Sequence, residues 1–125
     1  MAAISVESIK QDRIEIRVED ATKGVVVRFI GDIDMEDPSK LLDPFLAKVH
    51  SEAIEKKLEV VSADFTKLNF LNSSGIKSIA KWVMKLSTAE HKYKLRFLHD
   101  PSISWQATSL QTLTFLVPGA VTVEK

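Results

Sequence analysis

The chain has 125 residues, of which 45% are hydrophobic and 27% are charged, as is usual for one globular domain with a substantial core. Seventeen basic residues balance seventeen acidic residues, so no net charge attracts nucleic acid or an anionic membrane. The absence of cysteine excludes disulfides and thiolate metal sites. We expect a single domain over residues 1–125 that is cytoplasmic, with no secretory signal in Met1–Lys10 and no membrane-spanning segment.

The first half of the chain predicts two strands and a helix. Residues 13–19 alternate between charged and aliphatic side chains, which is the period of a half-buried strand. After a polar turn at 20–24, the apolar residues 25–27 and 29–30 predict a second, more central strand. Two Asp-Pro pairs follow, and the apolar spacing predicts a regular helix from about Pro44 to Lys57, preceded by a looser turn.

The second half of the chain predicts strands and helices in alternation. A third strand is expected over Glu59–Leu68, followed by a helix that ends near Thr88. The remaining predicted elements are a strand, a helix and a short final strand: Lys94–Leu98, Ile103 to about Leu116, and Ala120–Val123. This β-β-α-β-α-β-α-β order predicts an α/β fold with one antiparallel pair at the start, parallel pairing elsewhere and helices mostly on one face.

The segment Asn69–Ile76 places two hydroxyl side chains, Ser73 and Ser74, where a buried strand ends and a helix begins. Backbone N–H groups at a helix start have no intrahelical acceptor, and the helix dipole adds partial positive charge there. A phosphate on either hydroxyl would therefore meet favourable electrostatics. No general base lies beside the serines, so the segment suits a reversible charge switch better than catalysis. Simple capping of the helix by the hydroxyls is the alternative interpretation.

Three local patterns stand out: the turn Gly31-Asp32-Ile33-Asp34, the run from Asp64 through Asn72-Ser73-Ser74-Gly75-Ile76, and the turn Asp100-Pro101 before the last helix. Over roughly residues 10–124, the chain in these respects resembles a STAS domain, the fold of bacterial anti-sigma factor antagonists. The first turn is similar to the family's Gly-Glu-Leu-Asp turn. The serine run is similar to its Asp-Ser-Ser-Gly-Leu/Ile motif, which is the most specific of the three patterns.

The resemblance implies a STAS-like mixed β-sheet of four to five strands, with three to four helices mostly on one face. It also implies a regulatory module that works by protein–protein recognition rather than as an enzyme. In the family, the serine before the motif's glycine is the phosphorylation site, and this position is Ser74 here. Phosphorylation by an anti-sigma factor or related serine kinase releases the antagonist, and a serine phosphatase restores it.

The sequence departs from the family at Asn72, where the family has an acidic residue. Asparagine caps helices well, so the turn itself is expected to persist. A kinase that reads the acidic group would not recognise this site. The departure therefore favours a second interpretation, in which the chain is a STAS scaffold or sensor subunit of a larger complex and is never phosphorylated. The last helix is also atypical, because it begins with Ser104-Trp105-Gln106.

The predicted partner-binding surface extends from the serine turn onto the next helix and the aspartate turn. A helical wheel at about 100° per residue places Lys77, Lys81 and Lys85 together opposite the apolar stripe, with Ser78 beside them. A solvated lysine face is one interpretation, and a groove for an acidic partner is the other. The predicted partner-binding residues are Asp32, Asp34, Asn72, Ser73, Ser74, Gly75, Lys77, Ser78 and Lys81.

Asp32 and Asp34 also raise catalytic and metal-binding interpretations. An Asp-x-Asp pair after an apolar strand resembles the nucleophile loop of haloacid-dehalogenase-like phosphatases, although Glu36 stands where that family has Thr or Val. An EF-hand calcium loop fails because Asp37 stands where glycine is required. We expect no metal and no cofactor. The histidines show no metal-ligand spacing and are predicted to lie on the surface: His50, His91 and His99.

Overall fold

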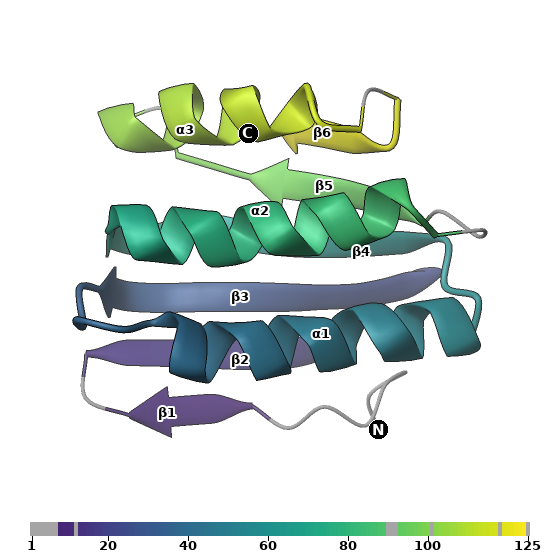
Figure 1. Cartoon of the computed structure of the whole chain (residues 1–125), viewed down its shortest axis with the longest axis horizontal. Helices are drawn as coiled ribbons and strands as arrows, with labels where there is room; N and C mark the ends of the chain where they lie inside the picture. The colour runs from purple at the N-terminus through teal and green to yellow at the C-terminus, as the bar shows by residue number, and fades with distance from the viewer. Residues whose placement is uncertain (1–7, 12, 90–92, 101, 118, 125) are drawn as a thin grey trace.

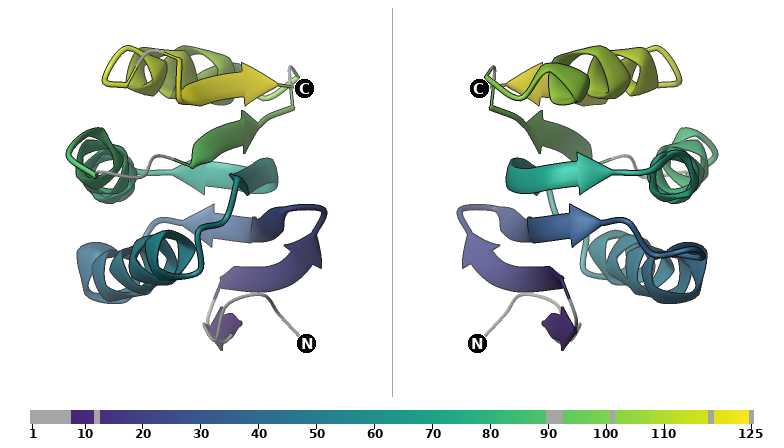
Figure 2. Two further views of the ribbon diagram at one scale, coloured as in Figure 1. Left: turned by 90° about the vertical axis from the view of Figure 1, so that its right-hand side faces the viewer. Right: turned by 90° about the vertical axis from the view of Figure 1, so that its left-hand side faces the viewer.

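The computed structural model describes residues 8–11, 13–89, 93–100, 102–117 and 119–124. Within them, one sheet has the strand order β1-β2-β3-β4-β5-β6, and the helices lie on one of its faces (Figure 1, Figure 2). The strands are β1 Ile9–Gln11, β2 Ile14–Ala21, β3 Gly24–Ile33, β4 Val60–Leu71, β5 Lys94–Leu98 and β6 Val121–Glu124. The helices are α1 Ser39–Glu55, α2 Ser73–Ser87 and α3 Ser104–Thr114. No helix in these ranges is long and apolar enough to cross a membrane.

The α/β class and the placement of the helices are confirmed, but the expected size of the sheet was wrong. The described residues form six strands rather than four to five. The missed strand is β1, whose three residues are too few for an alternating pattern to be recognised. It pairs antiparallel with β2, so the sheet begins with two antiparallel pairs and not one. The pairs β3–β4, β4–β5 and β5–β6 are parallel.

Two predicted boundaries also differ from the structure. Helix α1 begins at Ser39 rather than near Pro44, which lies inside the helix. The carbonyl of Pro38 accepts hydrogen bonds from the next turn, so the helix is already established before Pro44, whose missing N–H removes one later bond. Strand β4 continues to Leu71 rather than Leu68 because its last residues still pair with the end of β3. The predicted turn residue Pro101 lies outside the described residues.

The core lies between the sheet and the helix layer. Three phenylalanines on neighbouring strands are fully buried: Phe29, Phe65 and Phe97. The ring centroids of Phe29 and Phe65 are 4.9 Å apart, and those of Phe65 and Phe97 are 5.6 Å apart. Trp82 on α2 is 1% exposed, and its Nε1 donates a hydrogen bond to the Tyr93 hydroxyl at 2.7 Å. Burial of aromatic rings on both layers fixes the helices against the sheet.

The opposite face of the sheet carries ion pairs. Arg28 on β3 donates hydrogen bonds to Glu19 on β2 at 3.1 Å and to Asp64 on β4 at 2.5 Å. Arg96 on β5 donates to both carboxylate oxygens of Glu124 on β6 at 2.8 Å, which holds the pKa of Glu124 below its ordinary value. Because these charges neutralise one another across the strands, this face is suited to contact with water.

His50 and His99, which were predicted to lie on the surface, are half-buried, and His91 lies outside the described residues. The Nδ1 atom of His50 lies 2.8 Å from the Tyr93 hydroxyl, and that of His99 lies 2.8 Å from the Glu124 carbonyl. Since the Trp82 indole can only donate to Tyr93, the Tyr93 hydroxyl is free to donate to His50. When Tyr93 donates in this way, Nδ1 of His50 accepts and the imidazole is neutral.

We expect the stability of the fold to decrease as His50 becomes protonated. Burial and, secondarily, the charge of Lys85 lower the pKa of His50 below its ordinary value of 6.5. The unfolded chain therefore binds the proton first, and the free energy of unfolding falls as the pH drops through the unfolded pKa of about 6.5. Between about pH 7.5 and about pH 5.5, wild type should lose more thermal stability than His50→Gln, whose amide can still accept from Tyr93. Equal pH dependence in circular dichroism melts would contradict this assignment.

Candidate functional site

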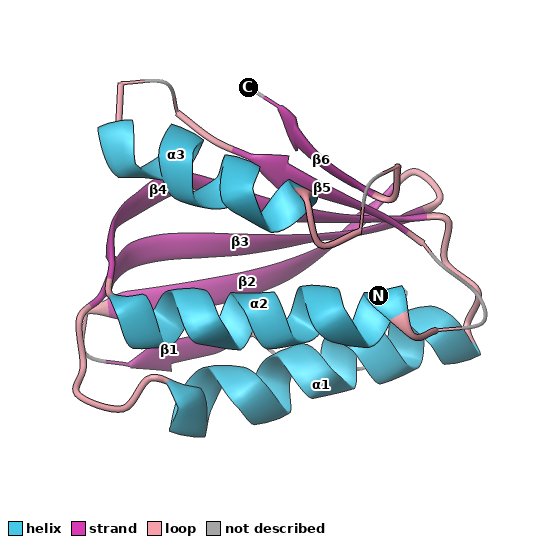
Figure 3. Cartoon of the chain, turned by 45° about the horizontal axis from the view of Figure 1, so that its top comes forward, coloured by secondary structure: helices cyan, strands magenta, loops and turns pink. Residues whose placement is uncertain are grey.

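The predicted serine site lies at one end of the sheet, where β3 and β4 finish and α1 and α2 begin; we call this end the carboxyl edge (Figure 3). Asn72 is the N-cap of α2, with an extended backbone and an Oδ1 atom that accepts from the Gly75 N–H at 2.8 Å. The backbone N–H of Asn72 donates to the Ile33 carbonyl at 3.0 Å. The start of α2 is therefore attached directly to the end of β3.

The side-chain amide of Asn72 makes two hydrogen bonds, and the carboxylate expected from the resemblance could make only one of them. Its Nδ2 donates to the Met35 carbonyl at 2.8 Å, in the loop between β3 and α1. A carboxylate could accept from the Gly75 N–H in the same way, but it has no hydrogen to donate to Met35. An amide at position 72 therefore makes both hydrogen bonds, whereas a carboxylate could make only the one to Gly75. The sequence alone could not show this because Asn72 and Met35 are 37 positions apart.

We expect Asn72→Asp to lower the free energy of unfolding by about 1–2 kcal/mol. The lost donor leaves the Met35 carbonyl facing a carboxylate, whereas the gain from a negative charge at the helix start is only about 0.3–1 kcal/mol. Asn69→Asp is the matched control, because the Asn69 side chain is exposed three residues earlier at the same edge. The control should change stability by no more than about 0.5 kcal/mol in urea unfolding. Similar losses in both variants would contradict the role of the Asn72 amide.

Within the described structure, the side chains of Ser73 and Ser74 do not stabilise the start of α2 through hydrogen bonds. Ser73 is exposed and Ser74 is half-buried. Among the described residues, neither hydroxyl forms a hydrogen bond, and Asn72 supplies the side-chain cap. The interpretation of the serines as helix caps was therefore wrong. Gly75 is buried, and a Cβ atom there would lie 2.4 Å from Leu71 Cδ1 and 3.1 Å from Ile33 Cγ2, so a small residue lets α2 cross close to β3 and β4.

The predicted aspartate turn lies next to the serine turn, because Asp32 pairs with Phe70 and Ile33 with Leu71 in the parallel ladder. Its two carboxylates do not point freely into solvent. Arg13, directly before β2, donates to Asp32 at 2.6 Å and to Asp34 at 2.5 Å. Sequence reasoning missed Arg13, whose relevance follows only from the antiparallel register that places Ile14 opposite Gly31.

The lysine face of α2 agrees with the helical wheel, but Ser78 does not belong to it. Lys77 and Lys81 are exposed, and Lys81 forms an ion pair with Asp43 of α1 at 2.9 Å. Ser78 is only 2% exposed, because α1 packs beside α2 and covers this flank. Its hydroxyl and, more strongly, Lys81 hold the pKa of Asp43 below its ordinary value. The prediction that Ser78 contacts a docked partner was therefore wrong for this arrangement of the helices.

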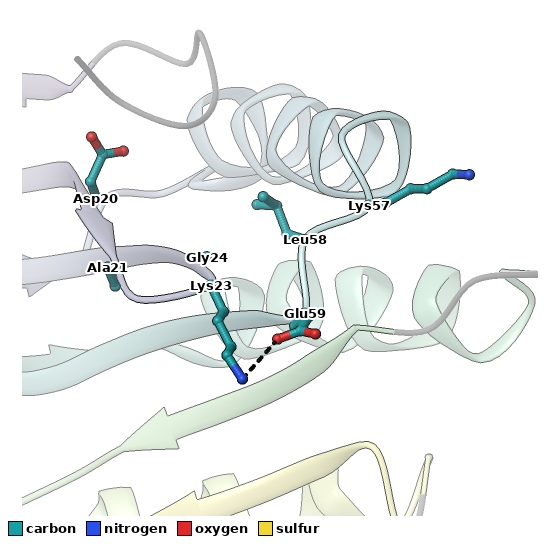
Figure 4. A pocket seen from close by; sticks show the side chains of 7 residues that line it. All are labelled: Asp20, Ala21, Lys23, Gly24, Lys57, Leu58 and Glu59. Atoms are coloured by element: carbon teal, nitrogen blue, oxygen red, sulfur yellow. Dashed lines mark ion pairs between the residues drawn. The ribbon is translucent and has the colours of Figure 1, made fainter.

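A cavity of about 80 Å³ separates α1 from α2 beneath this ion pair, and its size suits small groups such as water rather than a cofactor. A second hollow, open and shallow, lies at the opposite end of the sheet, where the β2–β3 turn meets the α1–β4 loop (Figure 4). Its charged groups include an exposed ion pair between Lys23 and Glu59 at 3.6 Å. Within the described residues, no group of three or more acidic or histidine side chains is arranged to hold a metal ion.

No family model and no curated protein sequence matches this chain. Similar solved structures include an anti-sigma factor antagonist from Mycobacterium paratuberculosis, with a TM-score of 0.66, 21% identity and coverage of 92% of this chain and 88% of that chain. The activator SiaC, in complex with the diguanylate cyclase SiaD from Pseudomonas aeruginosa, gives a TM-score of 0.65, 15% identity and coverage of 94% and 97%. The anti-sigma factor antagonist SpoIIAA in its unphosphorylated form gives a TM-score of 0.55, 19% identity and coverage of 88% of both chains.

Identities of this size show the fold and not the activity. The mixed sheet, the helices on one face and the serine turn at the start of α2 are the features that the sequence patterns had indicated. The chain has a STAS-like fold, the fold of the anti-sigma factor antagonists.

Proposed function

We propose that this protein is a partner-switching regulator that binds an anti-sigma factor or a related serine kinase at its carboxyl edge. One observation carries the proposal. Ser73 and Ser74 lie at the capped start of α2 in a STAS-like fold, and their hydroxyls are not used in hydrogen bonds within the described structure. The structural neighbours include an activator in complex with the enzyme it activates and two anti-sigma factor antagonists, which supports a role in recognition rather than catalysis.

The proposed docking surface combines the serine turn with the segments that the fold places beside it. The end of β3 and the N-terminal turns of α2 meet at the carboxyl edge, so one partner surface could contact both. Within this surface, Ser74 is the proposed covalent switch. The proposed contact residues are Asp32, Asp34, Asn72, Ser73, Ser74, Lys77 and Lys81, whereas Gly75 is buried and serves the close approach of α2 to the strands.

Phosphorylation of Ser74 would oppose docking for electrostatic reasons. A phosphate adds about −1.5 to −2 charges at neutral pH. Asp32 and Asp34 already place negative charge beside the turn, and Arg13 is shared between them. Burying an unpaired phosphate in an interface costs several kcal/mol, and each 1.4 kcal/mol is about tenfold in affinity. We therefore expect phosphorylation to weaken partner binding by about a hundredfold or more, with a serine phosphatase reversing the effect.

The test is affinity capture from the native host, combined with mass spectrometry of the tryptic peptide Leu68–Lys77, which contains both serines. We expect a regulatory kinase among the captured proteins and a phosphate on Ser74 in part of the population. With the captured partner purified, Ser74→Asp should weaken binding by about a hundredfold, as a mimic of the charge. Ser51→Asp, at an exposed position near the far end of α1, is the matched control and should bind like wild type.

A second candidate function is a scaffold or sensor subunit that keeps the same docking surface without a covalent switch. The hydrogen bond from Asn72 to Met35 favours this function, because it gives the amide at position 72 a structural role. The amide also stands in place of the acidic group that a kinase would read in the family motif. Binding that is unchanged in Ser74→Asp, together with an unmodified peptide, would support this scaffold and reject the switch.

A further inference from the structure

Phe70 is a large aromatic side chain in an unusual position. It lies near the end of β4, and 49% of it is exposed, whereas Leu68 and Leu71 are 0% and 7% exposed. The register between β3 and β4 is interrupted here, because Gly31 pairs with Leu68 and the next residue, Asp32, pairs with Phe70. Since Leu71 returns to the core and successive side chains alternate, the phenyl ring points away from the helix layer.

The backbone that presents Phe70 is held on both sides. On one side it pairs with Asp32 of β3. On the other side, the Trp105 indole of α3 donates to the Asn69 carbonyl at 3.0 Å, and the Gln106 amide donates to the Leu68 carbonyl at 2.8 Å. An aromatic ring on a fixed backbone loses little conformational freedom when it is buried by a partner. This is the usual situation of a residue that contributes strongly to an interface.

Single exposed apolar side chains are common on protein surfaces, so the location of Phe70 has to distinguish it. The other large hydrophobic residues that are clearly exposed among the described residues are Met84, Phe115 and Leu116. Met84 lies on the outer face of α2 among lysines. Phe115 and Leu116 follow α3, which ends at the opposite end of the sheet from the start of α2 (Figure 1). Of these four residues, Phe70 is the one at the carboxyl edge.

The charges around Phe70 indicate the chemistry of a complementary surface. Its strand neighbour Asp32 begins a segment that also contains Asp34, Glu36 and Asp37. Within the described contacts, Arg13 binds two of these four carboxylates. Beside the ring, Asp32 and its near neighbour Asp34 share the single guanidinium of Arg13, so this group carries excess negative charge that basic side chains would complement.

We propose that Phe70 is the apolar anchor of the docking surface, inserting into an apolar pocket of a partner protein whose rim carries Lys or Arg side chains opposite Asp32 and Asp34 and none opposite Ser74. This inference deepens the proposed function and depends on it. It assigns most of the contact energy to a residue outside the serine motif, whereas the serines control whether the contact can form. Arg13 holds the acidic side chains in place beside the ring, so the partner meets a preorganised rim.

The test uses as its probe the protein that the wild-type chain enriches from the native host, purified after identification by mass spectrometry. Phe70→Ala should weaken binding of this protein by about thirtyfold or more in calorimetric titration. Phe115→Ala is the matched control: it removes the same ring at a more exposed site, 72% against 49%, and should bind within about twofold of wild type. Phe70→Leu, which keeps an apolar side chain, should retain most of the affinity, and Asp34→Asn should slow association at low salt.

Thermal melts of each variant separate loss of docking from loss of folding. If Phe70→Ala melts below wild type, Phe70→Lys decides, because a lysine tolerates the exposed site and its charge opposes a basic rim. If Phe70→Ala and Phe70→Lys both bind within about twofold of wild type, the inference is overturned and the proposed function stays intact. If wild type enriches no protein above the background of resin that carries no protein, the proposed function and the inference fail together.

Discussion

Gly31→Ala is expected to lower the free energy of unfolding by about 3 kcal/mol or more. Gly31 has a φ of +106°, a conformation that costs an L-residue about 1–3 kcal/mol. A Cβ atom at this position would also lie 2.1 Å from the Arg13 carbonyl oxygen. That oxygen cannot easily move, because it accepts the Asp32 N–H at 2.9 Å. The added methyl group must therefore displace backbone at the carboxyl edge.

Gly119→Ala separates conformational strain from the clash. Gly119 has a φ of +89°, but a Cβ atom there would meet nothing within 4 Å. Only the strain remains, so the expected loss is about 1–2 kcal/mol in urea unfolding. Equal losses for the two substitutions would show that the approach of Arg13 to Gly31 is unimportant. Gly31→Ala should in addition disturb the ion pairs from Arg13 to Asp32 and Asp34, which are built on the same turn.

Gln106→Leu is expected to lower the free energy of unfolding by about 3 kcal/mol or more. Gln106 is fully buried, and its Nε2 donates to the Phe65 carbonyl at 2.5 Å and to the Leu68 carbonyl at 2.8 Å. Its Oε1 accepts from the Asp100 N–H at 2.8 Å. A leucine would leave these three backbone groups without their partner, and each such group costs about 1–3 kcal/mol.

The control for this substitution is Gln111→Leu on the exposed side of the same helix. It should change stability by no more than about 0.5 kcal/mol, because Gln111 is exposed and its amide donates a weak hydrogen bond to the neighbouring Thr114 hydroxyl at 3.3 Å. Gln106→Glu provides a further comparison, since it keeps the acceptor for Asp100 and loses the donors for β4. If Gln106→Leu and Gln111→Leu unfold at the same urea concentration, the proposed link between α3 and β4 is wrong.

The sequence predicted most of the fold because long elements carry a periodic pattern. The alternation in 14–18 and the stripe in α2 were sufficient to assign a strand and a helix. β1 was missed because three residues contain less than two periods, and its pairing with β2 is decided by tertiary contact. The start of α1 was misplaced because Pro44 was assigned to the first turn, whereas the structure accepts it inside the helix.

For the candidate site, the sequence predicted the junction and the cap but not the contacts that join distant segments. Asn72 was expected to cap α2, and it does. Its bond to Met35 depends on the parallel pairing of β3 with β4, which brings the two loops together. The burial of Ser78 likewise depends on the position of α1, and a helical wheel of α2 gives no information about neighbouring helices. The exposure of Phe70 follows from an interruption in strand register that no local pattern shows.

The two tryptophans occupy very different environments, and this gives the protein two natural optical reporters. Trp82 is enclosed between α1, α2 and the sheet, so its emission should respond to unfolding but not to events at the surface. Trp105 is half-buried and its indole is bonded to Asn69, one residue before Phe70. A Trp82→Phe chain would therefore emit from the carboxyl edge alone, and a spectral change on mixing with another protein would report occupation of that edge without any added dye.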